Sequence, residues 1–384
     1  MAYAIHDYAS MLSDKHRVKA YSEALRRAIK KNDVVVDLGT GTGYFAVLAC
    51  RLGAKQVYAI ELNPAIAIGK KLAEENHVAD RITWFHEDSH NIMLPEKADV
   101  LVSDLRGLLP HCEGILPAII DARQRFLKSG GHLIPQTDRI WITLAADNEA
   151  YQNATTPWHP VSLGSVTART YSETLANAYT SSDLTTATVL AESQLWQVID
   201  YRKATTLDHR QTVNFTIEQA APAHGFFLWF ECQVDEISSY GYGPKTPAPV
   251  YGCAFFPLKT PLDVKVDDRV SIDISTILGA DGFEWTWQTQ YQPREQKDDP
   301  TSFQQSTFYN PKDSTSDLYR RKSSNSRPSL TLSGRLAHHA LGLMQTDLTI
   351  GEIAAVLAEE NPQLSWPSED WLKFVIKLST KYSD

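Results

Sequence analysis

The stretch VVVDLGTGTGYFAVLACRLGAKQVYAIE, residues 34–61, decides the predicted fold. Three β-branched residues lead into an Asp, alternating glycines follow, and an apolar segment precedes a short strand ending in a Glu. This order predicts a strand–turn–helix–strand unit, in which glycine supplies unusual backbone angles and room for a ligand. The third glycine comes one position too early for the dinucleotide pattern G-x-G-x-x-G. No Lys-Ser/Thr follows the turn, which excludes a Walker phosphate loop.

Two carboxylates flank this turn. Asp37 lies directly before it, where it would repel a pyrophosphate but suits a cationic ligand. Glu61 follows 24 residues later, at the end of the second strand, where an acid accepts hydrogen bonds from ribose hydroxyls. The stretch resembles the S-adenosylmethionine (SAM) site of class I methyltransferases, whose motif is D-x-G-x-G-x-G. The resemblance implies a SAM cofactor, with a binding set of Asp37, Gly39, Gly41, Gly43 and Glu61.

Composition narrows the possible classes of protein. A chain of 384 residues allows two or three domains at roughly 100–200 residues each. The net charge of −9 argues against general nucleic-acid binding, which needs a basic surface. The four cysteines have no metal or redox spacing, so no metal site is expected. No signal peptide opens the chain, and no apolar run approaches the roughly 18 residues of a membrane span. We therefore predict a soluble, cytoplasmic protein with reduced thiols.

Residues from about 10 to 31 have the apolar spacing of an amphipathic helix. Its first part, residues 11–17 (MLSDKHR), resembles the M-L-x-D-x-x-R segment that precedes the SAM domain in protein arginine methyltransferases. The resemblance implies that Met11 packs on the cofactor and that Arg17 pairs with its carboxylate. The alternative is an ordinary, solvated helix start.

A third strand is expected at Ile82–Phe85, followed by a polar loop of sequence EDSH at residues 87–90. In class I methyltransferases the loop after the third strand brackets the adenine, often with an acid that accepts from its exocyclic amine. The resemblance assigns this role to Asp88, with Ser89 or His90 as the alternative.

The loop after the expected fourth strand, residues 103–113 (SDLRGLLPHCE), carries two acids nine residues apart, Asp104 and Glu113. It resembles the S-E-W-M-G-Y loop of protein arginine methyltransferases, which has a second Glu at the same spacing; the whole resemblance covers about residues 5–145. A guanidinium has five donors, and two carboxylates grip it by charge-assisted bonds and hold one nitrogen in line with the methyl group. The alternative is that Asp104 caps the loop and Glu113 begins a helix.

This chain departs from the family pattern in ways that leave the methyl acceptor open. Asp104 replaces a longer Glu, and Arg106 replaces an apolar residue in the same loop. The family's Thr-His-Trp loop aligns with residues 250–252 (VYG), so its histidine is missing. We expect Arg106 and Tyr251 on the acceptor side of the site. The acceptor is therefore an arginine of a peptide or protein, a small guanidino compound, or another amine, and a non-catalytic peptide-binding protein is the rival from another class.

Beyond Pro135 the pattern changes from alternating strands and helices to strands, which predicts the β-barrel or sandwich of that family. Within it, Ala168–Val189 has helical spacing where the family inserts a dimerisation arm, so we expect a homodimer; a surface loop is the alternative. The last residues predict a small helical domain that loosely resembles a winged-helix module or is a packing appendage. The expected boundaries are 1–31 for the N-terminal helical segment, 32–137 for the Rossmann-like SAM domain, 138–292 for the barrel with its arm at about 165–190, 293–328 for a linker and 329–384 for the helical domain.

Together these features predict an α/β class I methyltransferase domain followed by a β-barrel and a small helical domain. The expected activity is SAM-dependent N-methylation of a basic, arginine-type acceptor, with no nucleic-acid or membrane partner. Asp104 and Glu113 are the expected catalytic pair.

Overall fold

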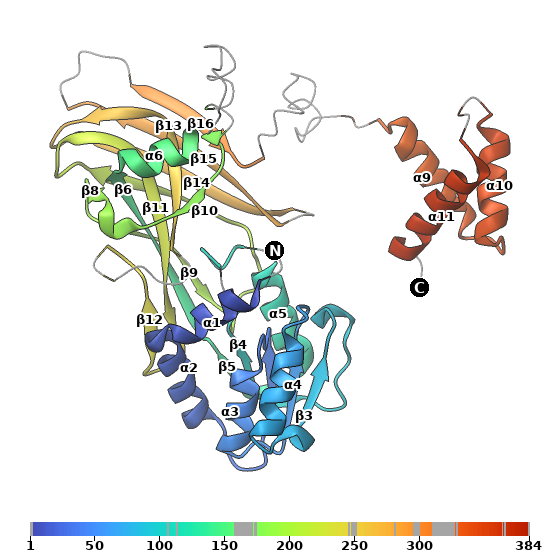
Figure 1. Ribbon diagram of the computed structural model, residues 1–384. Coiled ribbons are helices and arrows are strands. Elements are labelled where there is room, and N and C mark those ends of the chain that lie inside the picture. Colours follow the sequence, from blue (N-terminus) through green and yellow to red (C-terminus); the bar gives the residue numbers. More distant parts are fainter. Residues whose placement is uncertain are drawn as a thin grey trace. The chain divides into compact units, whose positions relative to one another are not determined.

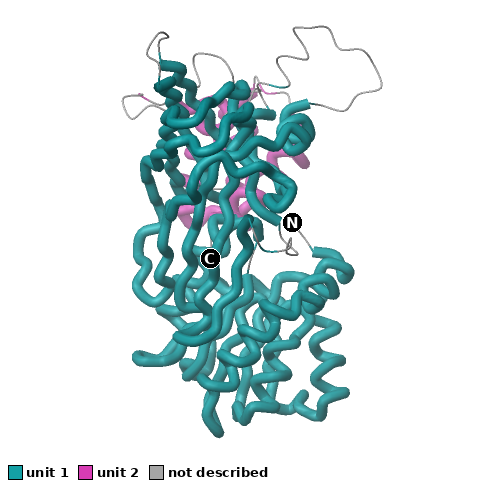
Figure 2. The backbone as a smooth tube through the Cα atoms, turned by 90° about the vertical axis from the view of Figure 1, so that its left-hand side faces the viewer, with its two compact units in different colours: residues 1–311 teal, residues 312–384 magenta. Residues whose placement is uncertain are grey.

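The computed structural model of the protein describes residues 3–105, 107–112, 114–156, 172, 175–244, 246, 252–279, 282–294, 300–308, 327, 329–362, 364 and 366–382. The chain divides into two compact units, residues 1–311 and 312–384 (Figure 2). In the described parts of the chain, no helix is long and apolar enough to cross a membrane.

A five-stranded parallel sheet forms the N-terminal part of the first unit. Its order is β3-β2-β1-β4-β5, and every neighbouring pair is parallel. The strands are β1 (Val34–Leu38), β2 (Gln56–Ile60), β3 (Ile82–Phe85), β4 (Ala98–Ser103) and β5 (Leu127–Ile134). The connecting helices are α3 (Tyr44–Leu52), α4 (Ile66–Glu75) and α5 (Ile115–Phe126), with the short turns η1 (Ala79–Arg81) and η2 (Ser89–Asn91) (Figure 1). The predicted Rossmann-like sheet is confirmed.

The loops that carry the predicted site residues lie at one edge of this sheet, because parallel strands all end on the same side. All five residues of β1 are buried, as expected for a strand covered on both faces. In register, Asp37 pairs with Ala59 of β2, and Leu38 pairs with Ser103 of β4. The glycine turn, Glu61 and the loop after β4 therefore start next to one another.

The N-terminal segment contains two helices where one was expected, α1 (Ile5–Ser13) and α2 (Lys15–Ala28). The break falls at Asp14, whose backbone is extended at φ −72° and ψ 90°. The Asp14 side chain accepts a hydrogen bond from the Arg17 amide at 3.1 Å and caps α2. An Asp favours such a cap over a helix interior, so it interrupts the helical periodicity.

Antiparallel strands form the rest of the first unit, as predicted. One sheet has the order β7-β13-β11-β6-β8, with β12 on β11 and β9 on β6; a second has the order β10-β14-β15-β16. The bounds are β6 (Thr137–Ala146), β7 (Thr180–Ser182), β8 (Thr188–Val189), β9 (Gln194–Asp200), β10 (His209–Thr216), β11 (Ala221–Gln233), β12 (Ser239–Gly241), β13 (Cys253–Val264), β14 (Arg269–Gly279), β15 (Gly282–Gln292) and β16 (Thr301–Ser306). A fully buried aromatic core fills the space between these sheets, including Trp196, Phe226, Phe256, Trp285 and Trp287.

Strand β16 lies inside residues 293–328, the segment that was expected to be a linker. Its buried Gln305 accepts from the Lys259 amide at 3.0 Å and donates to the Pro257 carbonyl at 3.0 Å, so a polar composition still gives a strand. The expected arm, at about 165–190, falls largely outside the described residues. Around it the structure describes α6 (Asn148–Thr155), β7, η3 (Leu184–Thr186) and β8.

Among the described residues of the second unit, the helices are α9 (Leu332–Leu343), α10 (Ile350–Glu360) and α11 (Ser368–Tyr382), in agreement with the predicted small helical domain. Helix α10 begins with a capping box, because Thr349 and Glu352 exchange side-chain and backbone hydrogen bonds. The apolar core of this unit has seven fully or nearly fully buried members, namely Leu336, Ala340, Ile353, Ala354, Leu357, Trp371 and Val375.

Candidate active site

A cavity of about 510 Å³ lies at the carboxyl ends of β1, β2 and β4 and is closed on one side by the start of α1 and α2. This volume is in the range of small-molecule sites, roughly 300–1,000 Å³. Nine residues singled out by the sequence or named as alternatives line it, namely Met11, Arg17, Gly39, Gly41, Glu61, Asp88, Ser89, His90 and Asp104. Residues from four separate segments are therefore brought together around one cavity.

The glycine turn is held against β2 and covered by side chains. The amides of Gly39 and Thr40 donate to the Ile60 carbonyl at 2.9 and 3.0 Å. A Cβ on Gly39 would lie 2.3 Å from a methyl of Leu105, and one on Gly41 would lie 2.8 Å from the ring of Tyr8. Both positions also have positive φ, so a larger residue would be strained there.

Gly43 and Asp37 support the turn from behind and are not among the cavity-lining residues. A Cβ on Gly43 would meet Trp84 at 2.7 Å and the Gly69 Cα at 2.8 Å, so this glycine serves helix packing. Asp37 is 1% exposed and accepts from the Thr40 hydroxyl at 2.6 Å. Burial raises the pKa of Asp37 to about 7, and the carboxylates of Asp104 and Glu61 add to this shift.

Glu61 projects its carboxylate into the turn. One oxygen accepts from the Gly41 amide at 2.8 Å, and the other accepts from the Asn63 amide at 2.8 Å. Each carboxylate oxygen has a further lone pair. The side chain is thus fixed in place and still offers acceptor capacity to hydroxyl groups in the cavity.

Arg17 and Asp104 form a buried ion pair that borders the same cavity. Their side chains are 3% and 10% exposed, and the guanidinium also donates to the Met11 carbonyl. Arg17 comes from the first turn of α2, and Asp104 directly follows β4. The groups assigned to the cofactor and to the acceptor are therefore in direct contact. Removing one partner of such a buried pair leaves an uncompensated charge.

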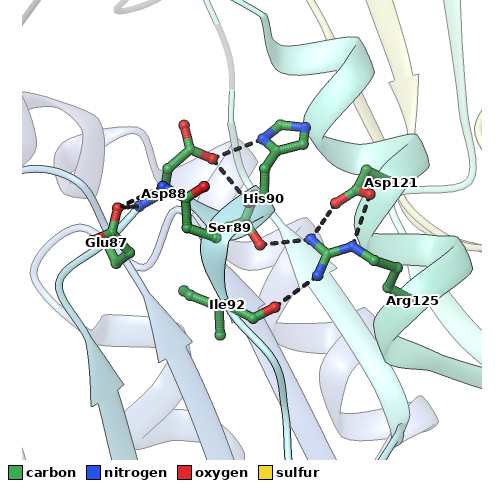
Figure 3. A network of polar contacts seen from close by, with 8 residues as sticks. Glu87, Asp88, Ser89, His90, Ile92, Asp121 and Arg125 are labelled. Atoms are coloured by element: carbon green, nitrogen blue, oxygen red, sulfur yellow. Dashed lines mark hydrogen bonds and ion pairs between the residues drawn. The ribbon is translucent and has the colours of Figure 1, made fainter. Parts of the chain in front are cut away.

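The loop after β3 is tied to α5 by Arg125, as Figure 3 shows. The Arg125 guanidinium donates to the Ser89 carbonyl at 2.6 Å and to the Ile92 carbonyl at 2.7 Å, and it forms an ion pair with Asp121. Within the loop, one oxygen of Asp88 accepts from the His90 amide at 2.9 Å and contacts the His90 ring nitrogen at 2.7 Å. The expected adenine-binding loop thus borders the cavity with a defined conformation.

Three predicted site residues, Arg106, Glu113 and Tyr251, lie outside the described residues. Several lining residues were not assigned to the site from the sequence, among them Tyr3, Tyr8, Thr40, Leu105 and Ile115. The sequence offered a signal for Tyr3 and Tyr8, which are the residues that could substitute for the aromatic Y-F-x-x-Y helix of protein arginine methyltransferases.

His111, eight residues after β4, is enclosed by aromatic rings. It is 2% exposed, and its ring centroid lies 5.0 Å from Phe283, 5.1 Å from Trp285 and 5.7 Å from Trp196. Burial, reinforced by the nearby His209, lowers the pKa of His111 from 6.5 to about 3. The ring is therefore neutral in the folded protein under ordinary conditions.

We expect His111 to destabilise the fold as the pH falls from 6.5 towards 3, because the unfolded chain binds a proton that the folded chain does not. The slope contributed by this one group is about 1.4 kcal/mol per pH unit. The free energy of unfolding, measured with urea between pH 4 and 7, should fall less steeply in His111→Phe than in the unaltered protein. The raised pKa of Asp37 increases the free energy of unfolding as the pH falls over an overlapping range. Both proteins contain Asp37, so the difference between their slopes reports on His111.

The control for this prediction is His132→Phe, which changes an exposed histidine on β5. Its pH slope should match that of the unaltered protein. Equal slopes for His111→Phe and the unaltered protein would contradict a neutral, buried His111.

Comparisons with known proteins agree with this architecture. A family model described as ribosomal protein L11 methyltransferase (PrmA) matches residues 18–135. Probable protein arginine N-methyltransferase 6.1 of Oryza sativa subsp. japonica is 28% identical over 253 residues, which cover 63% of this chain and 62% of the relative.

Two solved structures are similar in fold. Protein arginine methyltransferase 10 of Arabidopsis thaliana has a TM-score of 0.68 and 20% identity, covering 79% of this chain and 97% of that one. The Trypanosoma brucei PRMT1 enzyme–prozyme heterotetrameric complex with AdoHcy has a TM-score of 0.68 and 18% identity, covering 79% of this chain and 98% of that one.

The parallel sheet, with its cavity at the strand ends, and the antiparallel sheets that follow define a class I methyltransferase fold with a β-barrel-type second part. The chain is similar in sequence to protein arginine N-methyltransferases, at 28% identity to the rice protein. It spans about 62% of the length of the rice relative. Among the residues that the structure describes, no group of three or more His, Cys, Asp or Glu side chains is placed to hold a metal ion.

Proposed function

We propose that this protein is a SAM-dependent N-methyltransferase that acts on a guanidino or arginine-type nitrogen. The single observation that carries the proposal is the cavity itself. The glycine turn, Glu61, Arg17 and Asp104 all line it. These groups match the polar parts of SAM together with a cationic acceptor.

The residues of the cavity fit the cofactor group by group. Glu61 is positioned to accept from ribose hydroxyls, and the loop at Asp88 and Ser89 borders the space for an adenine. Arg17 offers a guanidinium to the cofactor carboxylate, since such pairs form bidentate bonds. Met11 adds apolar surface. When bound, SAM supplies a methyl group on a positively charged sulfonium. The AdoHcy complex of the Trypanosoma relative supports this choice of cofactor.

Asp104 and Glu113 are proposed to hold the acceptor. Two carboxylates fix a planar guanidinium and draw positive charge towards the nitrogens they contact, so the nitrogen facing the methyl group recovers lone-pair character. In the structure Asp104 borders the cavity and accepts from the Arg17 guanidinium. We place Arg106 and Tyr251 on the acceptor side, as the sequence suggests.

An acceptor panel with labelled SAM tests the proposal. Arginine peptides or free arginine should be methylated, while matched peptides with Lys in place of Arg should not. Labelling of the Lys peptides alone would favour a methyltransferase of another amine, which is the first alternative.

The second alternative is a SAM-fold peptide-binding protein without catalysis. Its specific support is the shorter Asp104 side chain, which is engaged by Arg17. Tight binding of S-adenosylhomocysteine with no transfer to any acceptor in a cell extract would establish this alternative and exclude the enzyme.

We also propose that the protein is a homodimer, since the predicted arm at about residues 165–190 stands at the point in the sequence where the family has its dimerisation arm. We propose a cytoplasmic location as well. The heterotetramer of the Trypanosoma relative is consistent with assembly through this kind of subunit. A molar mass of one chain by light scattering would overturn the dimer.

A further inference from the structure

A hairpin of the antiparallel sheet that contains β11 contacts the N-terminal end of helix α2. The hairpin is formed by β11 and β12 and continues into Tyr242. The Tyr242 hydroxyl donates to one oxygen of Asp14 at 2.5 Å, although the two residues are 228 positions apart. Tyr242 is buried, at 6% exposure. The bond is therefore a shielded contact between distant segments.

Asp14 uses its two oxygens for two different tasks. One oxygen accepts from Tyr242, and the other accepts from the Arg17 amide at 3.1 Å and so caps α2. A carboxylate held on both sides has little freedom to rotate. The cap therefore transmits the position of the hairpin to the first turn of α2.

Arg17 is the residue whose position depends on this cap. Its amide is the donor of the cap bond, and its guanidinium reaches the cavity wall, where it contacts Met11 and Asp104. A small rotation of the first turn would move the guanidinium by more than the backbone, because the side chain is long.

The same hairpin also fixes α2 further along. Arg27 donates through Nε to Asp235 at 2.8 Å, and the Tyr21 ring lies 5.9 Å from that of Tyr240. The far end of the helix is thus anchored independently. Loss of the Tyr242 bond should loosen only the start of α2, next to the cavity.

We infer that Tyr242 is a positioning residue for the cofactor site, acting through Asp14 on Arg17. The inference rests on the proposed function in that it takes Arg17 to bind the carboxylate of SAM. Tyr242 has no contact with the cofactor in this role. It determines where the guanidinium stands, and so how tightly the cofactor binds.

Tyr242→Phe tests the inference, since it removes only the hydroxyl. The dissociation constant of S-adenosylhomocysteine, measured by calorimetry on the full chain, should rise about five- to tenfold, because only part of the free energy of the lost hydrogen bond is passed on to the cofactor site. In turnover assays, KM for SAM should rise by a similar factor while kcat changes less than about twofold, because only binding is affected.

The matched control is Tyr291→Phe, which removes another tyrosine–carboxylate bond, that of Tyr291 to Asp268 at 2.7 Å. This bond lies between β15 and the loop before β14 and not at the cavity. It should leave the affinity for S-adenosylhomocysteine unchanged. An equal loss of affinity in both variants would overturn the inference, because it would show general destabilisation.

Double substitution separates the proposed path from other effects. In an Asp14→Ala background, Tyr242→Phe should add nothing further to the dissociation constant, since the bond is already lost. Asp14→Asn keeps the oxygen that caps α2 and presents its amide NH2 to Tyr242, whose hydroxyl oxygen can accept from it. It should therefore recover most of the affinity that Asp14→Ala loses, even if Tyr242→Phe fails to fold. Full additivity, or no rescue by Asn, would overturn the inference.

Failure of the proposed function and failure of the positioning role of Tyr242 give different results. If the unaltered protein binds neither SAM nor S-adenosylhomocysteine, the proposed function fails. If it binds and Tyr242→Phe binds equally well, only the positioning role fails.

Discussion

Glu61→Ala is expected to weaken S-adenosylhomocysteine binding about 100-fold or more. The carboxylate holds the Gly41 and Asn63 amides at 2.8 Å each and is the proposed acceptor for the ribose hydroxyls. Hydrogen bonds to a charged group contribute roughly 1.5–3 kcal/mol each, and loss of about 3 kcal/mol is a factor of more than 100 in the dissociation constant. Titration calorimetry on the purified protein measures the effect directly.

Glu87→Ala is the control for this prediction. Glu87 is another acid in the cavity wall, but it holds the backbone of its own loop through the Asp88 amide at 2.8 Å. We expect its effect on the dissociation constant to stay within about threefold, because its hydrogen bonds, to the Asp88 amide and the Asn91 side chain, are exposed and lie within its own loop. A Glu61→Ala protein that binds within the same range would remove the basis for the cofactor assignment.

Glu113→Gln is expected to reduce methyl transfer roughly 1,000-fold while leaving S-adenosylhomocysteine binding within about threefold. We expect positioning and charge withdrawal by Asp104 and Glu113 to lower the activation free energy by about 4 kcal/mol, which corresponds to that factor in rate. Gln keeps the size of the side chain and removes only its charge. The measurement is the initial rate with labelled SAM and a saturating arginine peptide.

Glu74→Gln, at an exposed position on α4, is the control and should retain the full rate. Turnover that survives in Glu113→Gln shows the two-carboxylate mechanism to be wrong. Asp104→Asn should also lose transfer, but it is less selective. Because Asp104 pairs with Arg17, its loss also disturbs the group proposed to bind the cofactor.

Local patterns predicted most of the elements. The strand that begins residues 34–61, the glycine turn after it and the strand Ile82–Phe85 were expected from residues close together in the sequence, and the structure has each of them. Errors came where a short polar feature outweighed local periodicity. Asp14 divides one expected helix into two, and Gln305 allows a strand inside an expected linker.

The site was predicted in its composition but not in its contacts. Met11, Arg17, Glu61 and Asp104 line one cavity, as their motifs implied, whereas Asp37 lies buried behind the turn. Tyr8 covers Gly41, and no motif pointed to that contact.

The sequence by itself determined the parallel sheet, the glycine turn and the kinds of charged group that surround it, because these depend on periodicity and motifs within a few dozen residues. Only the tertiary structure decided which of these groups touch. Arg17 meets Asp104 across 87 positions, and Tyr242 meets Asp14 across 228. Contacts between segments so far apart leave no local pattern, since they depend on how the sheets and α2 pack against one another.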